Sequence, residues 1–318
     1  GSVEIPNGGW WRLNSGLVLS SPSITLKGTG VGNSSRLYFS DTTYTGILIS
    51  GPSCEIRDIS VGFASRTGIS TCIVDDATGQ TRIKNVTIDG CHSGIRTSSA
   101  KSVIRDVSVI NTTPSSSIGL LIQGTAEVRE VNNFFFENAS GQDAFSGIQI
   151  EGGSGIQISN CDLQKCGVPL RMIADGVTNI FSVNADNTFF DTSTSFGVSM
   201  KTTGSGVITR SRFSNCWMSS CNQGLVVDGD IRGLIISSSE ILDNTNAGIK
   251  VEAGSSLEGL VVTGNIIAGN GTGIDIGANV SDFTITGNRI GAADGFVGNS
   301  TGISLSGTTD DYVITGNN

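Results

Sequence analysis

The sequence predicts an all-β solenoid, and three observations lead to this fold class. The 318 residues include 44 Gly and only 5 Pro, with Val and Ile as the main apolar residues, which is typical of short strands joined by tight turns. Apolar and polar residues alternate at a spacing of two, and apolar residues at helical spacing are scarce. A strand motif also recurs along the chain, as a solenoid requires.

The repeat begins with Gly, an aliphatic residue, any residue and a second aliphatic residue. Gly224-Leu-Val-Val returns as Gly248-Ile-Lys-Val, and successive starts lie about 21 to 30 residues apart, the length of one solenoid coil. The starts are Gly46, Gly68, Gly94, Gly119, Gly147, Gly197, Gly224, Gly248, Gly273 and Gly302, with Val168-Pro169-Leu170 filling the one gap. We expect about eleven to twelve coils, each with three short strands, and therefore three parallel sheets.

The repeat also predicts the organisation of the chain. We expect residues 1–318 to form a single domain, with N-terminal coils over residues 1–45 and regular coils over residues 46–318. The last repeat, beginning at Tyr312, stops in mid-coil, which would expose strand edges. We therefore expect the chain to be a fragment of a longer protein.

Alternation within each strand predicts which side chains form the core. The inward positions after the glycines are Ile148, Ile150, Val198, Met200, Leu225, Val227, Ile249, Val251, Ile274 and Ile276. A corner position changes from aliphatic to polar along the chain, through Ile59, Val86, Val107, Val131, Cys161, Asp186, Ser211, Ser239, Asn265, Asn288 and Asn317. Stacked coils lie about 4.8 Å apart, so the late Asn residues are expected to form an amide ladder.

The net charge and the length of the apolar runs narrow the range of possible partners. The net charge is -9, which argues against duplex nucleic acid or an anionic membrane as a partner. No apolar run reaches the roughly 20 residues needed to cross a bilayer.

The seven cysteines are expected to be reduced and packed, because their number is odd and they occupy apolar or corner positions. We expect no cofactor and no metal site.

The opening of the chain resembles a known superfamily. Val3-Glu-Ile-Pro6-Asn-Gly8 and Ile24-Thr-Leu26-Lys-Gly28-Thr-Gly30 are similar to the first coils of phage tailspikes in the pectin-lyase-like superfamily. The resemblance implies a right-handed parallel β-helix, a homotrimer, and a groove beside the sheet of Gly-led strands. It also implies a bacterial cell-surface polysaccharide as partner and a place on the virion tail, with secretion or the bacterial cell surface as the alternative. It implies no particular reaction.

The outward positions of the Gly-led strands are the candidate site, because charge gathers there. They are Gln149, Glu151, Arg171, Ser199, Lys201, Val226, Asp228, Lys250, Glu252 and Asp275. Insertions before this sheet place Phe145 and Phe196 just ahead of their glycines. Aromatic rings beside carboxylates and amides suit a sugar, which has an apolar face and a polar edge. The predicted substrate-binding residues are Phe145, Phe196, Gln149, Arg171, Lys201, Lys250 and Asp275.

Asp228 and Glu252 are the leading catalytic candidates. They occupy matching positions on neighbouring coils, and glycoside hydrolysis needs two carboxyl groups roughly 5 to 9.5 Å apart. One would protonate the leaving oxygen while the other served as base or nucleophile. Glu151, with Asp143 and Asp191 on nearby loops, forms a second candidate cluster.

Three other interpretations remain open for the same surface. A polysaccharide lyase would use a Lys or Arg base, and Arg171 or Lys201 near Glu151 could serve. A noncatalytic adhesin or structural spike would bind a glycan without cleaving it. The charges could also form an ordinary solvated face on which acids and bases partly cancel.

Overall fold

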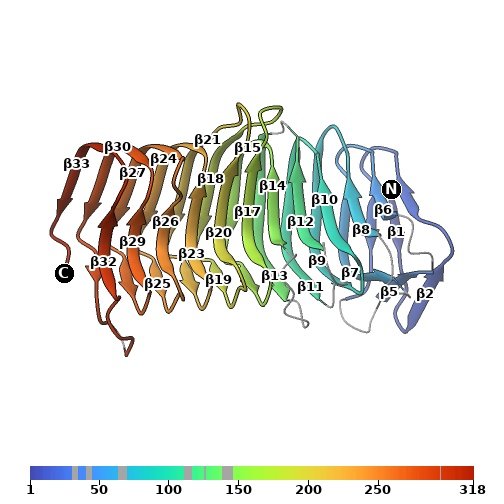
Figure 1. Cartoon of the computed structure of the whole chain (residues 1–318). Coiled ribbons are helices and arrows are strands. Elements are labelled where there is room, and N and C mark those ends of the chain that lie inside the picture. The colour runs from blue at the N-terminus through green and yellow to red at the C-terminus, as the bar shows by residue number, and fades with distance from the viewer. Residues whose placement is uncertain are drawn as a thin grey trace.

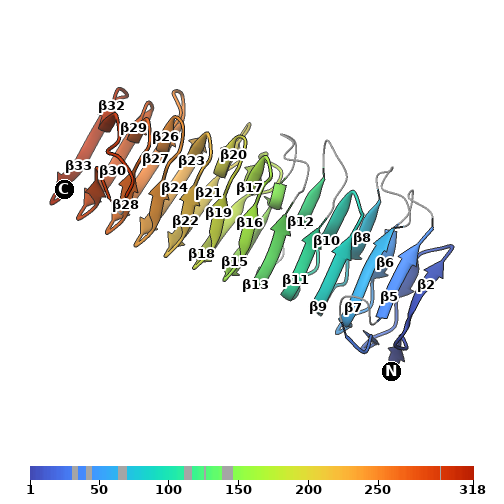
Figure 2. The ribbon, with the colours of Figure 1, turned by 90° about the horizontal axis from the view of Figure 1, so that it is seen from below.

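The computed structural model describes residues 1–30, 35–40, 45–63, 70–110, 117–124, 127–137, 146–293 and 295–318. Every regular element in this part of the chain is a β-strand, as predicted. The strands coil around one long axis, with the two termini at opposite ends of the stack (Figures 1 and 2). All strand pairings between coils are parallel, so the described chain is a parallel β-helix.

The Gly-led strands form a 12-stranded sheet, here called the first sheet, which agrees with the expected number of coils. Each strand pairs with its equivalents one coil before and one coil after. In order, the strands are β3 (Leu17–Leu19), β6 (Thr45–Ile49), β8 (Thr71–Asp75), β10 (Ser93–Thr97), β12 (Ile118–Gln123), β14 (Ser146–Glu151), β17 (Val168–Ala174), β20 (Phe196–Thr202), β23 (Gln223–Asp228), β26 (Ala247–Val251), β29 (Thr272–Ile276) and β32 (Thr301–Leu305).

The second and third sheets are joined into one 21-stranded network. Four long strands, β7 (Glu55–Phe63), β9 (Gln80–Asp89), β11 (Lys101–Ile110) and β13 (Glu127–Glu137), pass through the corner without a break. Elsewhere the second sheet contains β1 (Ser2–Glu4), β4 (Thr25–Lys27), β15 (Gly153–Ser159), β18 (Ile180–Asp186), β21 (Ile208–Ser214), β24 (Asp230–Ser237), β27 (Ser256–Thr263), β30 (Asn279–Thr286) and β33 (Thr309–Thr315). The third contains β2 (Gly9–Leu13), β5 (Ser35–Phe39), β16 (Asp162–Gln164), β19 (Phe189–Asp191), β22 (Trp217–Ser219), β25 (Glu240–Leu242), β28 (Ile266–Ala268) and β31 (Arg289–Ile290).

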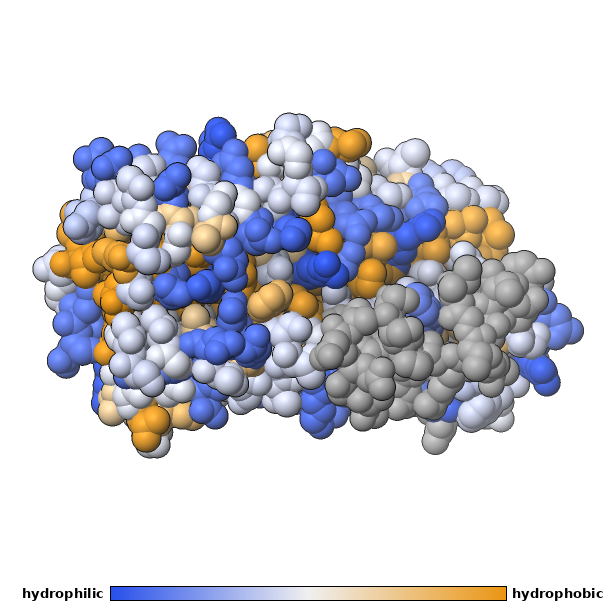
Figure 3. Space-filling view, viewed as in Figure 1, coloured by the Kyte–Doolittle hydropathy of each residue, from blue (hydrophilic) through white to orange (hydrophobic). Residues whose placement is uncertain are grey.

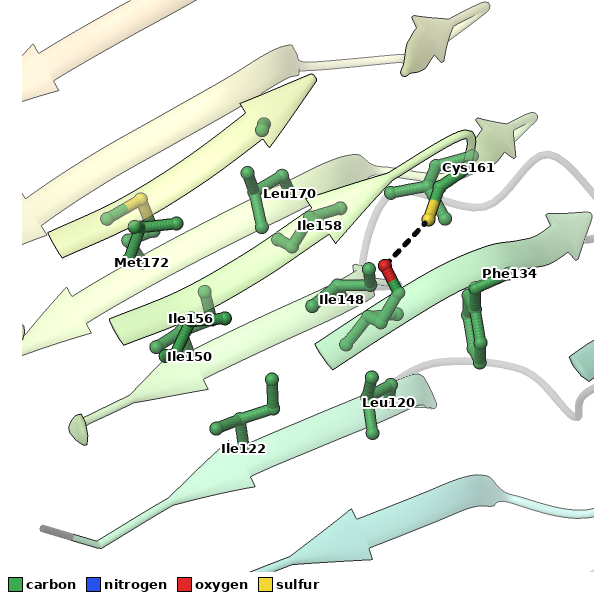
Figure 4. Packing of buried hydrophobic residues seen from close by; sticks show 14 of the residues in the cluster. Leu120, Ile122, Phe134, Ile148, Ile150, Ile156, Ile158, Cys161, Leu170 and Met172 are labelled. Atoms are coloured by element: carbon green, nitrogen blue, oxygen red, sulfur yellow. Dashed lines mark hydrogen bonds between the residues drawn. The ribbon is translucent and has the colours of Figure 1, made fainter. Parts of the chain in front are cut away.

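The core consists of stacked aliphatic side chains, and all the predicted inward residues of the first sheet are fully buried. In Figure 4, Leu120, Ile148 and Leu170 line up across three successive coils. The initial glycines bring neighbouring backbones close together, since a Cβ on Gly224 would lie 2.5 Å from the carbonyl oxygen of Gly248. A side chain at Gly224 would therefore clash with that carbonyl.

Two details of the repeat differ from the prediction. Gly68, the predicted start of the third coil, lies outside the described residues, and in β8, which pairs Thr71 with Thr45, Cys72 is opposite Gly46. At the corner, Phe134, Thr188 and Cys216 occupy the places assigned to Val131, Asp186 and Ser211. The coils differ in length. A corner residue predicted by counting a fixed number of positions from the preceding strand is therefore wrong in some coils.

The predicted amide ladder is present at the end of the chain. The side-chain nitrogen of Asn265 donates to the side-chain oxygen of Asn288 at 2.9 Å, and Asn288 donates to Asn317 at 2.9 Å. Asn288 also donates to the Val262 carbonyl and accepts from the Asn265 amide. A second ladder, which the sequence analysis missed, links Asn244, Asn270 and Asn299 between the third and first sheets.

The cysteines behave as packed side chains. All seven are buried and none forms a disulfide. Burial raises the pKa of Cys161 to about 11 and that of Cys221 to about 12, so both thiols remain protonated at neutral pH. Within the described ranges, no three His, Cys, Asp or Glu side chains are arranged to hold a metal ion.

Two charged residues, Asp75 and Arg129, are buried in the part of the chain that the structure describes. Asp75 is fully buried in the inward column and accepts hydrogen bonds from the hydroxyls of Thr81, Thr97 and Ser102 at 2.5 to 3.1 Å. Burial raises the pKa of Asp75, while these hydrogen bonds oppose the increase. Arg129, also buried, donates to the backbone of neighbouring turns, and burial lowers its pKa to about 10 against the opposing charge of Asp75.

We predict that Asn288→Ala destabilises the fold by about 1–3 kcal/mol, because it leaves buried backbone groups without partners. Denaturant unfolding followed by circular dichroism would measure the change. The matched control is Asn246→Ala, since Asn246 makes a similar amide bond to Asn222 but in an exposed setting. Equal losses for the two variants would contradict a special role for the buried ladder.

We also predict that Asp75 makes stability depend on pH. A raised pKa means that the folded state holds the proton more tightly than the unfolded state. The contribution of Asp75 to stability is therefore greatest below its unfolded pKa of about 3.9 and is lost as pH rises through its higher folded pKa.

The stability of the native protein relative to Asp75→Asn should accordingly fall as pH increases. Urea unfolding at several acidic and neutral pH values would test this, with the exposed Asp310→Asn as control. If the stability of the native protein relative to Asp75→Asn increased with pH, the pKa of Asp75 would be lowered in the folded state and not raised.

Candidate functional site

The outer face of the first sheet presents two parallel columns of side chains, because residues two apart on a strand point the same way. The first column contains Gln149, Arg171, Ser199, Val226, Lys250 and Asp275. The second column contains Gln123, Glu151, Ile173, Lys201, Asp228 and Glu252. The outward residues chosen on the first-sheet strands therefore share one face, but they do not form one cluster.

A groove of about 550 Å³ crosses the middle of this face. Five predicted residues line it: Arg171, Phe196, Lys201, Asp228 and Glu252. Ser199 and Val226 form its floor and are buried although they point outward. Figure 3, in the orientation of Figure 1, shows hydrophilic side chains running between apolar patches across the face where β12 to β29 lie.

Among the described residues, the groove contains one ion pair and one charge of each sign that has no partner. Lys201 Nζ lies 2.7 Å from Asp228 Oδ2, and both side chains are nearly half exposed. Such a pair adds little stability, but it orients the Asp228 carboxylate. Arg171 and Glu252 form no hydrogen bond or ion pair through their side chains with any described residue. Their charges are available to a ligand.

The two leading carboxylates lie on consecutive coils. Asp228 ends β23 and Glu252 follows β26, with the Glu252 amide donating to the Val227 carbonyl at 2.9 Å. One coil corresponds to about 4.8 Å, so the two residues start from backbones close enough for the carboxyl separations that glycosidases use. The geometry is compatible with paired acid–base chemistry.

Glu151 lies apart from this pair. It is three coils, or roughly 14 Å, from Asp228 along the second column, with Ile173 between. Its carboxylate accepts hydrogen bonds from Gln123 at 2.7 Å and from Gln149, so it is held within a local amide network. Asp191 lies at the end of β19 on the third sheet and so does not join Glu151, and Asp143, the third member of that candidate cluster, lies outside the described residues.

The remaining candidates have different positions. Lys250 and Asp275 form an ion pair and line a neighbouring hollow of about 390 Å³ toward the C-terminus. Phe145 and Asp143 lie outside the described residues. The sequence analysis missed Val168 and Ser195, which line the groove beside Phe196. Their positions in the repeat could have identified them, because Val168 is the first residue of β17 and Ser195 immediately precedes β20.

Comparisons with known proteins support the fold. The family model described as "Right handed beta helix region" matches residues 146–318, more than half of the chain. No curated protein matches the sequence. Within the described residues, no helix is long and apolar enough to cross a membrane.

Several solved structures are similar. The A-module of mannuronan C-5 epimerase from Azotobacter vinelandii is 14% identical with a TM-score of 0.71, covering 99% of this chain and 91% of its own. The catalytic domain of a GH87 α-1,3-glucanase in complex with tetrasaccharides is 14% identical with a TM-score of 0.67, covering 100% and 64%. A mutant tailspike protein of E. coli bacteriophage HK620 in complex with a pentasaccharide is 11% identical with a TM-score of 0.64, covering 98% and 72%.

This chain thus spans less than two thirds of the glucanase domain, and at these identities the similarity concerns the fold. The resemblance inferred from the opening coils agrees with the matched structures, which include a tailspike. Because the family model matches more than half of the sequence and the coils are parallel throughout, the chain belongs to the right-handed β-helix family.

Proposed function

We propose that this protein binds a polysaccharide across the outer face of the first sheet and cleaves it by glycoside hydrolysis. The observation that carries the proposal is the groove in which Asp228 and Glu252 meet Phe196 and Arg171. An aromatic ring can stack on the apolar face of a sugar, and the charged groups can bond its hydroxyls. The groove is open, as access by a polymer requires.

The surroundings of the two carboxyl groups suggest separate roles. Glu252 has no side-chain partner among the described residues, so it is free to approach the leaving oxygen as general acid. Asp228 is oriented by Lys201 at 2.7 Å and is the base or nucleophile. Arg171 and Phe196 position the sugar on the side of the groove that faces the N-terminal coils.

A lyase is the second candidate, and the unpaired Arg171 is the observation that favours it. Its guanidinium could neutralise a uronate carboxylate while Lys201 removed a proton. In the structure, however, the Lys201 ammonium is engaged by Asp228, which argues for hydrolysis. The products distinguish the reactions, because elimination creates an unsaturated sugar that absorbs ultraviolet light and hydrolysis does not.

The proposed substrate is a bacterial cell-surface polysaccharide, and the proposed location is a virion tail. The similarity to a tailspike structure with a bound pentasaccharide supports this assignment. A secreted or surface-attached bacterial enzyme is the alternative, since the matched epimerase comes from a bacterium. No cofactor is invoked, because paired carboxyl groups suffice for hydrolysis.

We predict that Asp228→Asn and Glu252→Gln each lower depolymerisation about 10²- to 10⁴-fold, the usual contribution of general acid–base catalysis. Reducing ends released from a panel of capsular and lipopolysaccharide O-chain glycans would measure the reaction. Binding to the same glycans should persist, because both variants preserve the shape of the groove.

Glu258→Gln is the matched control, since Glu258 is an exposed acid on the second sheet. Native rates in both groove variants would overturn the catalytic assignment. Binding without new reducing ends or ultraviolet-absorbing products in the native protein would instead identify a noncatalytic adhesin.

We further propose a homotrimer. Trp10 and Trp11 are 60% and 46% exposed on the first coils, large apolar surfaces that a neighbouring subunit could cover. Sedimentation equilibrium should then give three times the chain mass of 32.8 kDa, and Trp10→Ser/Trp11→Ser should shift the population toward monomer. A monomer mass for the native protein at all concentrations would exclude the trimer.

A further inference from the structure

A second group of aromatic side chains lies on the outer face of the third sheet. Phe189 on β19 and Trp217 on β22 occupy the same column on consecutive coils, and their ring centroids are 6.3 Å apart. Phe189 is 49% exposed. Figure 2 shows β16, β19 and β22 as successive rungs of the sheet. Neither ring belongs to the groove of the first sheet.

Carboxylates border this aromatic pair on both sides. Asp162 stands one coil before Phe189 in the same column, and Glu240 stands one coil after Trp217. Asp191 lies in the adjacent column, two residues from Phe189. Burial raises the pKa of Asp162, with further contributions from the charges of Asp191 and Glu137. The surface is therefore rich in hydrogen-bond acceptors and negative in charge.

Among the residues that the structure describes, the chain covers only one end of this face. Trp217 packs on its C-terminal side against an apolar cluster of Leu242, Ala268 and Ala293, and Phe296 packs against the same cluster. The Gly269 amide also donates to the Val297 carbonyl at 2.8 Å, which fastens residues 295–300 over this end. That covering ends before Phe189, which is exposed, whereas the neighbouring acids are half-buried.

We infer that Asp162, Phe189, Asp191, Trp217 and Glu240, here called the third-sheet platform, bind a neutral or amino-bearing glycan. Aromatic rings offer stacking surfaces for sugar rings, and ionised carboxylates accept hydrogen bonds from hydroxyl or ammonium groups. Successive coils are about 4.8 Å apart, close to the length of one sugar ring. Each rung can thus meet one sugar of an extended chain.

The charge of the platform selects among glycans. Three acids, Asp162, Asp191 and Glu240, form no ion pair with any described residue, whereas Glu137 on the preceding rung is paired with Lys165 at 2.6 Å. An anionic polysaccharide would meet uncompensated like charge. A neutral chain avoids that repulsion, and amino sugars gain from it.

The platform and the groove lie on adjacent faces of the same coils. β19 ends at Asp191 and β20 begins at Phe196, so a short corner separates the two surfaces. A long glycan could contact both, yet binding at the platform requires no cleavage. The inference therefore stands independently of the hydrolase assignment.

The test is a glycan array of neutral, amino-bearing and anionic oligosaccharides probed with the intact chain, followed by titration of the bound glycans. The native protein should retain neutral or amino-bearing glycans. Phe189→Ala should weaken their binding roughly fivefold or more, as loss of one aromatic contact implies. Asp162→Asn, which keeps the side-chain volume, should weaken amino-bearing glycans more than neutral ones.

Phe181→Ala is the matched control, since Phe181 is 45% exposed on the second sheet, and its binding should equal that of the native protein. Phe196→Ala separates the two sites. Binding lost in Phe196→Ala but unchanged in Phe189→Ala would overturn the platform while leaving the groove intact.

Failure of the native protein to retain any neutral or amino-bearing glycan would overturn the inference as well. So would an oligomer that dissociates in Phe189→Ala, because the platform would then be a subunit interface. Thermal melting of each variant verifies that the fold is retained.

Discussion

The structure depends on one constraint, the hydrogen bonding of each strand to its equivalent in the next coil. Parallel pairing fixes the coil spacing at about 4.8 Å and places like positions above one another. A residue therefore contacts its counterparts before and after it more than its own neighbours in sequence. Leu120, Ile148 and Leu170 are packed together for this reason, although 50 residues of chain separate the first from the last.

The same constraint explains how polar groups are accommodated inside. Asn288 bonds both to the coil before and to the coil after, so a column of identical amides satisfies itself and the turns around it. Asp75 has no equivalent carboxylate on the next coil. It is instead surrounded by hydroxyls on three strands, which supply donors that an aliphatic column lacks. A repeated polar residue extends a ladder, whereas a single one needs partners of its own.

On the outer faces, stacking places residues of successive coils side by side, so that a few residues together form a distinct surface. The groove arises where a carboxylate, a guanidinium and an aromatic ring on neighbouring coils surround the buried Ser199 and Val226. The platform arises where two aromatic residues follow one another on the third sheet. Since the core is continuous beneath both, these faces can differ without altering the coil. A single coil can therefore present two different side-chain surfaces.

The sequence by itself determined the all-β class, the coil number, the inward aliphatic columns and the late Asn ladder. Each depends on a pattern that repeats, and repetition is visible in one dimension. The corner residues Phe134, Thr188 and Cys216 were missed, because coil lengths vary and the register is set by hydrogen bonds between coils.

Only the tertiary structure decided which candidates meet. It joined Asp228, Glu252, Arg171 and Phe196 in one groove, placed Glu151 three coils away, and revealed the platform around Phe189 and Trp217. Proximity across the stack depends on the exact pairing of residues 20 to 30 positions apart, and a shift of one residue turns a side chain to the opposite face. Composition and spacing identify the outer face of the first sheet as the candidate surface. The register between coils decides which side chains on that face lie close together.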